Sequence, residues 1–155
     1  MTTTLALAVT LHLLAALVWV GGMFFAHLAL RPAAAAVLEP PLRLTLWEGV
    51  LRRFFRWVWG AVAVLLVTGY GIVFVVYGGF AATRPFVHLM SAGGLLMVAL
   101  FAWVYFVPFA RMGRAIADQD WPAAARQQGR IRTVVAVNLA LGLATSVVGV
   151  AGRYL

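Results

Sequence analysis

The feature that most constrains this chain is a long uncharged stretch near its N-terminus. Residues 5–30 contain no Asp, Glu, Lys or Arg. As an α-helix they would extend about 39 Å at ~1.5 Å per residue, enough to cross the ~30 Å hydrocarbon layer of a bilayer with some tilt. The stretch is too long for the apolar region of a secretory signal, and the preceding MTTT lacks a basic residue. We therefore expect a retained transmembrane helix.

Three further apolar stretches repeat this pattern. Together with the first, they predict spans at about residues 5–30, 57–79, 85–110 and 131–152. The chain is 65% hydrophobic and has only 12 basic and 4 acidic side chains, which is too little charge for a soluble domain. Short connections between successive spans favour an all-α fold: an integral membrane antiparallel four-helix bundle, in a single transmembrane domain over residues 1–155.

The arginines predict how this bundle is oriented. Five lie between the first and second spans and five between the third and fourth, whereas the opposite side has only Arg84 and Arg153. Because loops rich in Lys and Arg stay in the cytoplasm, both long loops are predicted to be cytoplasmic. Both termini then lie on the outer, periplasmic side of a bacterial plasma (inner) membrane.

The long loops are predicted to be partly helical. Apolar residues at three- and four-residue steps after Pro41 predict that the second helix begins near Leu42, well before its span. Asp118 and Asp120, followed by Pro122, predict a helix start that runs into the fourth span. Within that span, a buried Asn138 is expected to bond across helices.

Histidines inside the spans are the candidates for a functional site, because an imidazole is costly in a bilayer. His12 lies roughly 10 Å below the outer start of the first helix, and His88 and Met90 occupy the first two turns of the third. The first and third helices of such bundles are commonly diagonal, so inward side chains at one depth can meet. This predicts a metal or haem-iron site in the outer half of the bundle. His27, near the inner end, is interpreted as an interfacial imidazole.

The sequence does not decide between His88 and Met90 as the partner of His12. Residues two apart on a helix differ by ~200°, so only one of the two can face the bundle axis. Met90 shares a helix face with Gly94 and Met97, a pattern typical either of a cofactor-facing surface or of ordinary core packing.

The roles of the remaining candidate site residues depend on whether the ligand is a metal ion or haem. For a metal ion, Met23 and Met97 would be deeper thioether ligands towards the cytoplasm. For haem, Gly22 and Gly94 would leave room for the porphyrin, and Arg84 would lie near the propionates or bind lipid phosphate instead.

Several kinds of chemistry lack the residues they need. The chain has no Cys and no Lys, which excludes thiolate metal sites and lysine chemistry. The absence of Asp and Glu from the predicted spans argues against a transporter that uses a buried carboxylate. No phosphate loop, nucleophile elbow or HExxH helix is present, which excludes a conventional hydrolase. Whether the protein is an enzyme stays open.

Four segments together resemble the CopD family of membrane proteins, which is associated with copper resistance and copper uptake. They are LHLLAALVWVGGMFFAHLALRP, LRRFFRW, FVHLMSAGGLLM and IRTVVAVNLALG. The resemblance covers about residues 11–152 and implies binding, uptake or delivery of copper, for which imidazole and thioether ligands are suited. Many family members have additional spans. The resemblance therefore suggests that this shorter chain acts as a homo-oligomer or within a larger membrane complex.

The layout is also similar to HemJ, a membrane protoporphyrinogen oxidase that binds b-type haem through a first-helix histidine and a third-helix lysine in an H-x-K setting. His12 matches the histidine, but Met90 stands at the lysine position. This departure argues against the same oxidase chemistry and leaves His/Met ligation of haem open. The alternatives to copper handling are thus a b-type cytochrome or haem-linked oxidoreductase, and a structural accessory subunit. The CopD resemblance places copper first.

Overall fold

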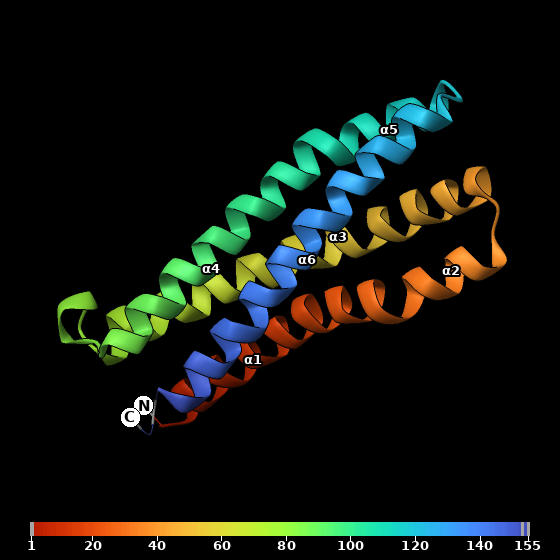
Figure 1. Cartoon of the computed structure of the whole chain (residues 1–155). Helices are drawn as coiled ribbons and strands as arrows, with labels where there is room; N and C mark the ends of the chain where they lie inside the picture. The colour runs from red at the N-terminus through yellow and green to blue at the C-terminus, as the bar shows by residue number, and fades with distance from the viewer. Residues whose placement is uncertain (1, 153, 155) are drawn as a thin grey trace.

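The chain folds into long antiparallel helices. The computed structural model describes residues 2–152 and 154, and no strand occurs among them. Four continuous helices, at residues 3–37, 40–76, 85–117 and 121–151, are long and apolar enough to cross a membrane. The predicted all-α, multi-pass fold is therefore confirmed. The start of α1 and the end of α6 lie at the same end of the bundle (Figure 1); Arg153 is outside the described residues.

Each long helix except the last contains a short π-helical segment. The elements in chain order are α1 (Thr2–Phe25), η1 (Ala26–Leu30), α2 (Arg31–Val37), α3 (Pro40–Gly71), η2 (Ile72–Val76), the 3₁₀ turn η3 (Phe80–Ala82), α4 (Pro85–Val104), η4 (Tyr105–Phe109), α5 (Ala110–Ala117) and α6 (Trp121–Ala151).

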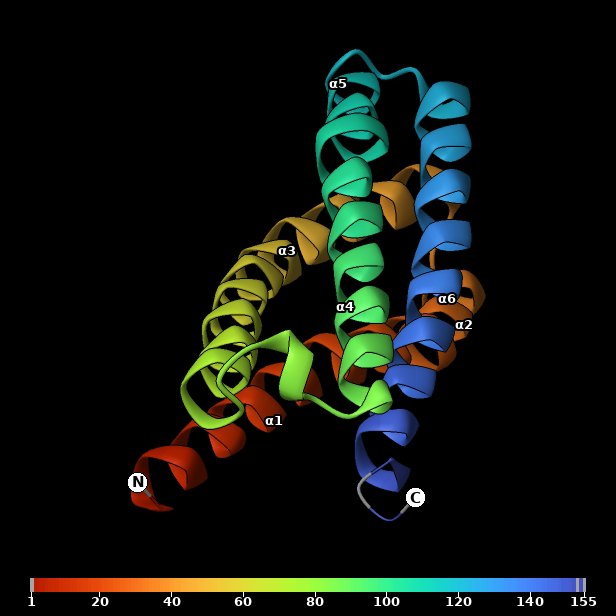
Figure 2. The same ribbon diagram turned by 90° about the vertical axis from the view of Figure 1, so that its left-hand side faces the viewer.

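Two crossing helical hairpins make up the bundle. One hairpin pairs α1 with α3, and the other pairs α4 and α5 with α6 (Figure 1). Viewed from the side, α4 and α6 run together while α1 and α3 are inclined to them (Figure 2). Helix α6 also contacts α1 and α3, so it joins the two hairpins.

The helices continue past the ends of the predicted spans. The first helix extends to Val37 rather than ending at Leu30, and the third extends to Ala117 rather than Ala110. Pro32 is the second residue of α2, which continues directly from η1, and Pro108 lies inside η4. A proline removes one backbone donor and crowds the preceding turn, and a wider π-helical turn accommodates it without ending the helix.

The connections follow the sequence signals more closely. The second long helix begins at Pro40, near the predicted Leu42. Helix α6 begins at Trp121, where the Asp120 side chain accepts a hydrogen bond from Ala123 N at 2.9 Å. In the turn before α4, Gly78 and Gly79 have φ angles of +74° and +120°, a region that glycine adopts readily because it has no Cβ.

Glycines allow close approach within each hairpin, as is common in membrane bundles. In the first hairpin, the Phe54 ring of α3 occupies the position where a Cβ on Gly22 of α1 would lie. In the second, a Cβ on Gly93 of α4 would lie 2.7 Å from Thr145 Oγ1 of α6. These helix pairs are therefore closer than larger residues would permit.

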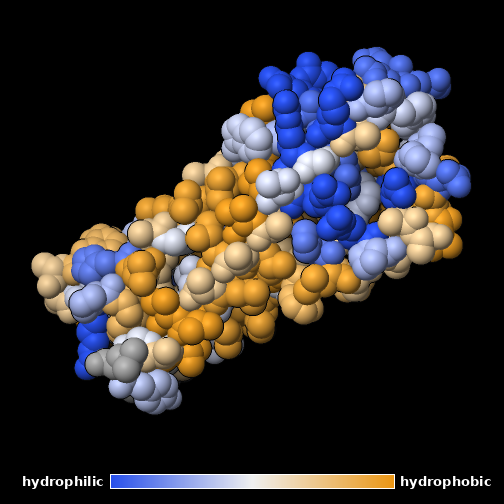
Figure 3. Space-filling view, in the orientation of Figure 1, coloured by the Kyte–Doolittle hydropathy of each residue, from blue (hydrophilic) through white to orange (hydrophobic). Residues whose placement is uncertain are grey.

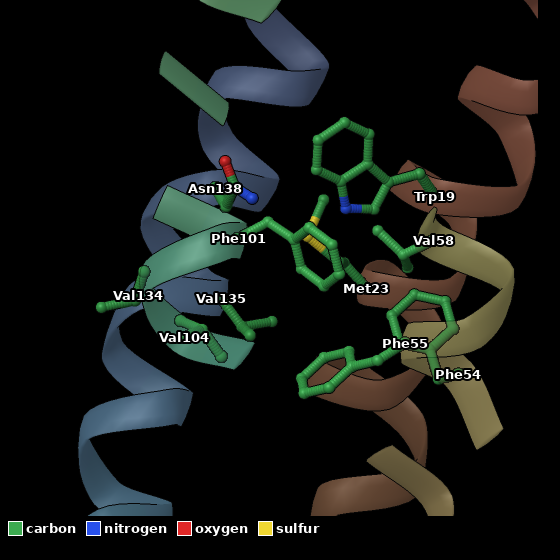
Figure 4. Close-up of a pocket in the computed structure, with 10 residues that line it drawn as sticks. All are labelled: Trp19, Met23, Phe54, Phe55, Val58, Phe101, Val104, Val134, Val135 and Asn138. Atoms are coloured by element: carbon green, nitrogen blue, oxygen red, sulfur yellow. The ribbon is translucent and has the colours of Figure 1, made fainter. Parts of the chain in front are cut away.

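Buried side chains from all four long helices meet near the centre of the bundle. Trp19, Met23, Phe55 and Phe101 are each at most 4% exposed there. They surround a cavity of about 10 Å³ (Figure 4), a volume that can hold about one water molecule. The cavity is also lined by Asn138, whose Nδ2 donates a hydrogen bond to Met97 O at 3.3 Å. The predicted cross-helix bond of this asparagine is confirmed.

The outer surface of the bundle divides into an apolar part and a charged end. Large hydrophobic side chains are exposed along the helices, as expected where lipid surrounds the protein. Figure 3 shows this hydrophobic band and, beside it, a hydrophilic end formed by the arginine-rich parts of the chain.

Candidate functional site

His12 of α1 faces α3 and is hydrogen-bonded there. Its Nδ1 lies 2.9 Å from Thr68 Oγ1, and the imidazole is half-buried. The Thr68 hydroxyl donates its one proton to Val64 O at 2.6 Å, so its oxygen is left to accept a proton from His12 Nδ1. A neutral imidazole at this position therefore carries its proton on Nδ1. The lone pair of Nε2 is then free for a metal ion.

The close approach of this imidazole depends on a glycine next to Thr68. A Cβ on Gly69 would lie 3.1 Å from His12 Cε1 and 3.6 Å from His12 Nδ1. The Nδ1–Cε1 edge of the ring therefore rests against the backbone of α3. A larger residue at 69 would push the imidazole away from the Thr68 hydroxyl.

His88 has a different environment at the end of the bundle. The side chain is exposed, its Nε2 lies 3.1 Å from Thr83 Oγ1, and its ring centroid is 5.5 Å from that of Phe80. Because the Thr83 hydroxyl donates to Phe80 O at 2.8 Å, its oxygen accepts from His88 Nε2. His88 is thus bound to the η3 turn, with Nδ1 as its remaining acceptor.

Met90 lies on the inward face of α4 and packs against α6. A Cβ on Gly149 would lie 2.8 Å from Met90 Cε and 3.1 Å from Met90 Sδ. Seven residues later on α4 and seven residues earlier on the antiparallel α6, a Cβ on Gly142 would lie 3.0 Å from Met97 Cε. Of the two residues between which the sequence does not decide, Met90 is therefore the one that faces the interior.

The deeper methionines are buried near the centre of the bundle. Met23 is 2% exposed and lines the central cavity, as does Asn138 (Figure 4). Met97 is 4% exposed. The Oδ1 of Asn138 has no hydrogen-bond partner among the described residues. The centre of the bundle thus combines a thioether with an available amide oxygen.

The other predicted site residues are spread over the bundle. Arg84 is exposed immediately before α4, and His27 is half-buried in η1. Gly94 has no atom within 4 Å of a Cβ position, so the space beside it is open, as a bulky ligand would require. The space beside Gly22, in contrast, is filled by Phe54.

The structure gives the candidate ligands separate neighbours. His12 contacts α3, Met90 contacts α6, and His88 contacts the η3 turn. No group of three His, Cys, Asp or Glu side chains that could hold a metal ion occurs in residues 2–152 and 154.

Two threonines were missed by sequence reasoning. Thr68 and Thr83 set the orientation and tautomer of His12 and His88, respectively. Thr68 is 56 residues from His12 and Thr83 is 5 residues from His88, and neither threonine belongs to a motif. For Thr68, only knowledge of which faces of the first and second helices pack together would have revealed the partnership.

The comparison with known protein families bears on what these residues do. The family model of copper resistance protein D, CopD, matches residues 48–151, two thirds of the chain. The chain belongs to the CopD family. The matched residues include most of α3 and all of α4 and α6, whereas α1 with His12 precedes them. Neither a curated protein nor a solved structure matches the chain. Membership of CopD links this multi-pass membrane protein to copper resistance.

Proposed function

We propose that this CopD-family protein binds copper in the half of the bundle that carries its termini and takes part in its uptake or delivery. The observation that carries the proposal is the His12–Thr68 hydrogen bond, which leaves Nε2 of a half-buried imidazole available in a family associated with copper resistance. A metal-ligating histidine typically has its other ring nitrogen held in this way.

Methionines supply the remaining ligands in this proposal. Met90 is the partner of His12, because it faces the interior, and exposed His88 is the first ligand to meet copper at the surface. Buried Met23 and Met97 continue the thioether series towards the arginine-rich end. Thioethers favour Cu(I), so we propose that copper is bound and moved as Cu(I). Because α1 and α4 belong to different hairpins, binding draws the two hairpins together.

The experiment is a Cu(I) titration of the detergent-purified full chain against a chromophoric Cu(I) chelator under anaerobic conditions. Removing a residue that only hydrogen-bonds a metal ligand typically costs ~10–100-fold in metal affinity. His12→Ala removes the proposed ligand itself, so it should weaken Cu(I) binding by more than this. His27→Ala is the matched control, because His27 is half-buried on the same continuous helix. Equal effects of the two substitutions, or no binding by the wild type, would refute the proposal.

An absorption spectrum of the same sample tests whether the protein binds haem. The copper account predicts a protein without a Soret band when it is produced with adequate haem supply. A Soret band that sharpens on reduction with dithionite would instead identify a b-type cytochrome, with His12 and Met90 or His88 as axial ligands.

We further propose that the arginine-rich end faces the cytoplasm of a bacterial cell and that the termini face the periplasm. The distribution of arginines between the two ends supports this orientation. Because the chain has no cysteine, single substitutions can be labelled without background. An impermeant maleimide should label Ala81→Cys in intact spheroplasts and Ala117→Cys only after permeabilisation. Both positions are exposed, and the reverse pattern would contradict the proposed orientation.

A further inference from the structure

A groove at the arginine-rich end of the bundle is separate from the histidines and methionines. It lies between α3 and the η4–α5 segment and has a volume of about 540 Å³. Arg52, Arg56 and Glu48 line it from α3, Arg114 from α5, and Tyr105 and Phe109 from η4. Its walls thus combine guanidinium groups with aromatic rings.

The charges in this groove are unbalanced. Arg52 forms an ion pair with Glu48, with Arg52 Nε donating to Glu48 Oε1 at 2.9 Å. No ion pair other than this one occurs in the described part of the chain. The chain has 12 basic and 4 acidic residues, and Glu48 is the one acid in the groove beside three arginines. The groove therefore carries a net positive charge that a bound anion would neutralise.

The groove also lies at the boundary between the charged and apolar parts of the surface. Arg56 immediately precedes the uncharged stretch of α3, and Arg114 lies one turn beyond the uncharged stretch that ends at Ala110. Figure 3 shows the hydrophilic end directly beside the hydrophobic band. Tyr105 and Phe109 lie at this level, where aromatic rings contact both headgroups and acyl chains. A ligand that fits both parts has an anionic head and an apolar tail.

We propose that this groove binds the headgroup of an anionic phospholipid. Arg56 and Arg114 contact the phosphate, Arg52 stays paired with Glu48, and the acyl chains lie along the apolar surface beside Phe109. Basic pockets between transmembrane helices are suited to such headgroups, and forked guanidinium donors match phosphate oxygens. The bound lipid bridges α3 and α5, which belong to different hairpins.

The test is native mass spectrometry of the full chain in detergent, titrated separately with phosphatidylglycerol, phosphatidylcholine and inorganic phosphate. The wild type should retain phosphatidylglycerol in preference to the other two. Arg56→Gln combined with Arg114→Gln should weaken phosphatidylglycerol binding roughly 30-fold, taking about 1 kcal/mol per arginine.

The matched control is Arg126→Gln combined with Arg130→Gln, which removes the same charge from exposed positions of α6 outside the groove. It should leave phosphatidylglycerol binding within about twofold of the wild type, a change of ~0.4 kcal/mol. Equal weakening in both double variants would mean diffuse attraction to the basic end and would overturn the proposal. Binding of inorganic phosphate as tight as that of the lipid would also overturn it, in favour of a soluble anion.

Discussion

His12 Nδ1 and Thr68 Oγ1 lie 2.9 Å apart across the α1–α3 interface, and the hydroxyl proton of Thr68 is committed to Val64 O. Thr68 is therefore a positioning residue for the proposed copper ligand. We predict that Thr68→Val, which keeps the shape of the side chain and removes the hydroxyl, weakens Cu(I) binding by about 10–100-fold. The chelator competition assay measures this change.

Thr68→Ser distinguishes positioning from packing. Serine retains the hydroxyl and loses the methyl group, so it should restore Cu(I) affinity to near the wild-type value. If Thr68→Ser weakens binding as much as Thr68→Val, the effect comes from packing, and the assignment of the His12 tautomer through Thr68 is wrong.

Two adjacent glycines offer a matched test of hairpin packing. The Phe54 ring occupies the Cβ position of Gly22, whereas no atom lies within 4 Å of the Cβ position of Gly21. We predict that Gly22→Ala lowers the free energy of unfolding by about 1–3 kcal/mol, the usual cost of overpacking. Gly21→Ala should be neutral or stabilising by up to ~1 kcal/mol through helix propensity. Unfolding in detergent monitored by circular dichroism measures both.

The buried amide of Asn138 is predicted to contribute little to stability. It makes one cross-helix bond, to Met97 O, while its Oδ1 has no partner among the described residues. Interhelical bonds in membrane proteins average ~0.6 kcal/mol, so Asn138→Leu should change the free energy of unfolding by less than about 1 kcal/mol. Asn138→Asp should be clearly more destabilising, because a buried carboxylate lacks the amide donor. Equal effects would contradict this account of the central cavity.

Glu48 is predicted to affect lipid binding more than folding. Its ion pair with Arg52 joins a half-buried carboxylate to an exposed guanidinium at i, i+4, and i, i+4 helix pairs contribute about 0.3–0.5 kcal/mol. Glu48→Gln should thus change stability by no more than about 0.5 kcal/mol. The substitution should also tighten phosphatidylglycerol binding, because it frees Arg52 and removes the negative charge from the groove. Weaker lipid binding in Glu48→Gln would argue against a phosphate in this groove.

Much of the fold could be predicted because membrane insertion constrains the sequence strongly. Uncharged stretches of the right length located all four helices, and Asp120 with Pro122 marked the beginning of α6. The uncharged stretches do not mark where the helices end, because Pro32 and Pro108 are accommodated at π-helical turns that have no sequence signature and the helices continue past residues 30 and 110.

The candidate site was less predictable than the fold. Helical periodicity placed Met90 and His88 on different faces, but only the packing of α4 on α6 showed that Met90 faces inward. The crossing of the two hairpins also depends on side chains far apart in sequence, such as Val20 beside Gly142. The partner of His12 on α3, Thr68, is likewise far away in sequence, and no local pattern indicates it.

The most direct test of the proposed function is X-ray absorption at the copper edge of the Cu(I)-loaded, detergent-purified chain. We expect both imidazole nitrogen and thioether sulfur around copper, with the imidazole contribution lost in His12→Ala and the sulfur contribution reduced in Met90→Leu. A copper environment without sulfur, or a spectrum unchanged by His12→Ala, would contradict the assignment of the site to His12 and Met90.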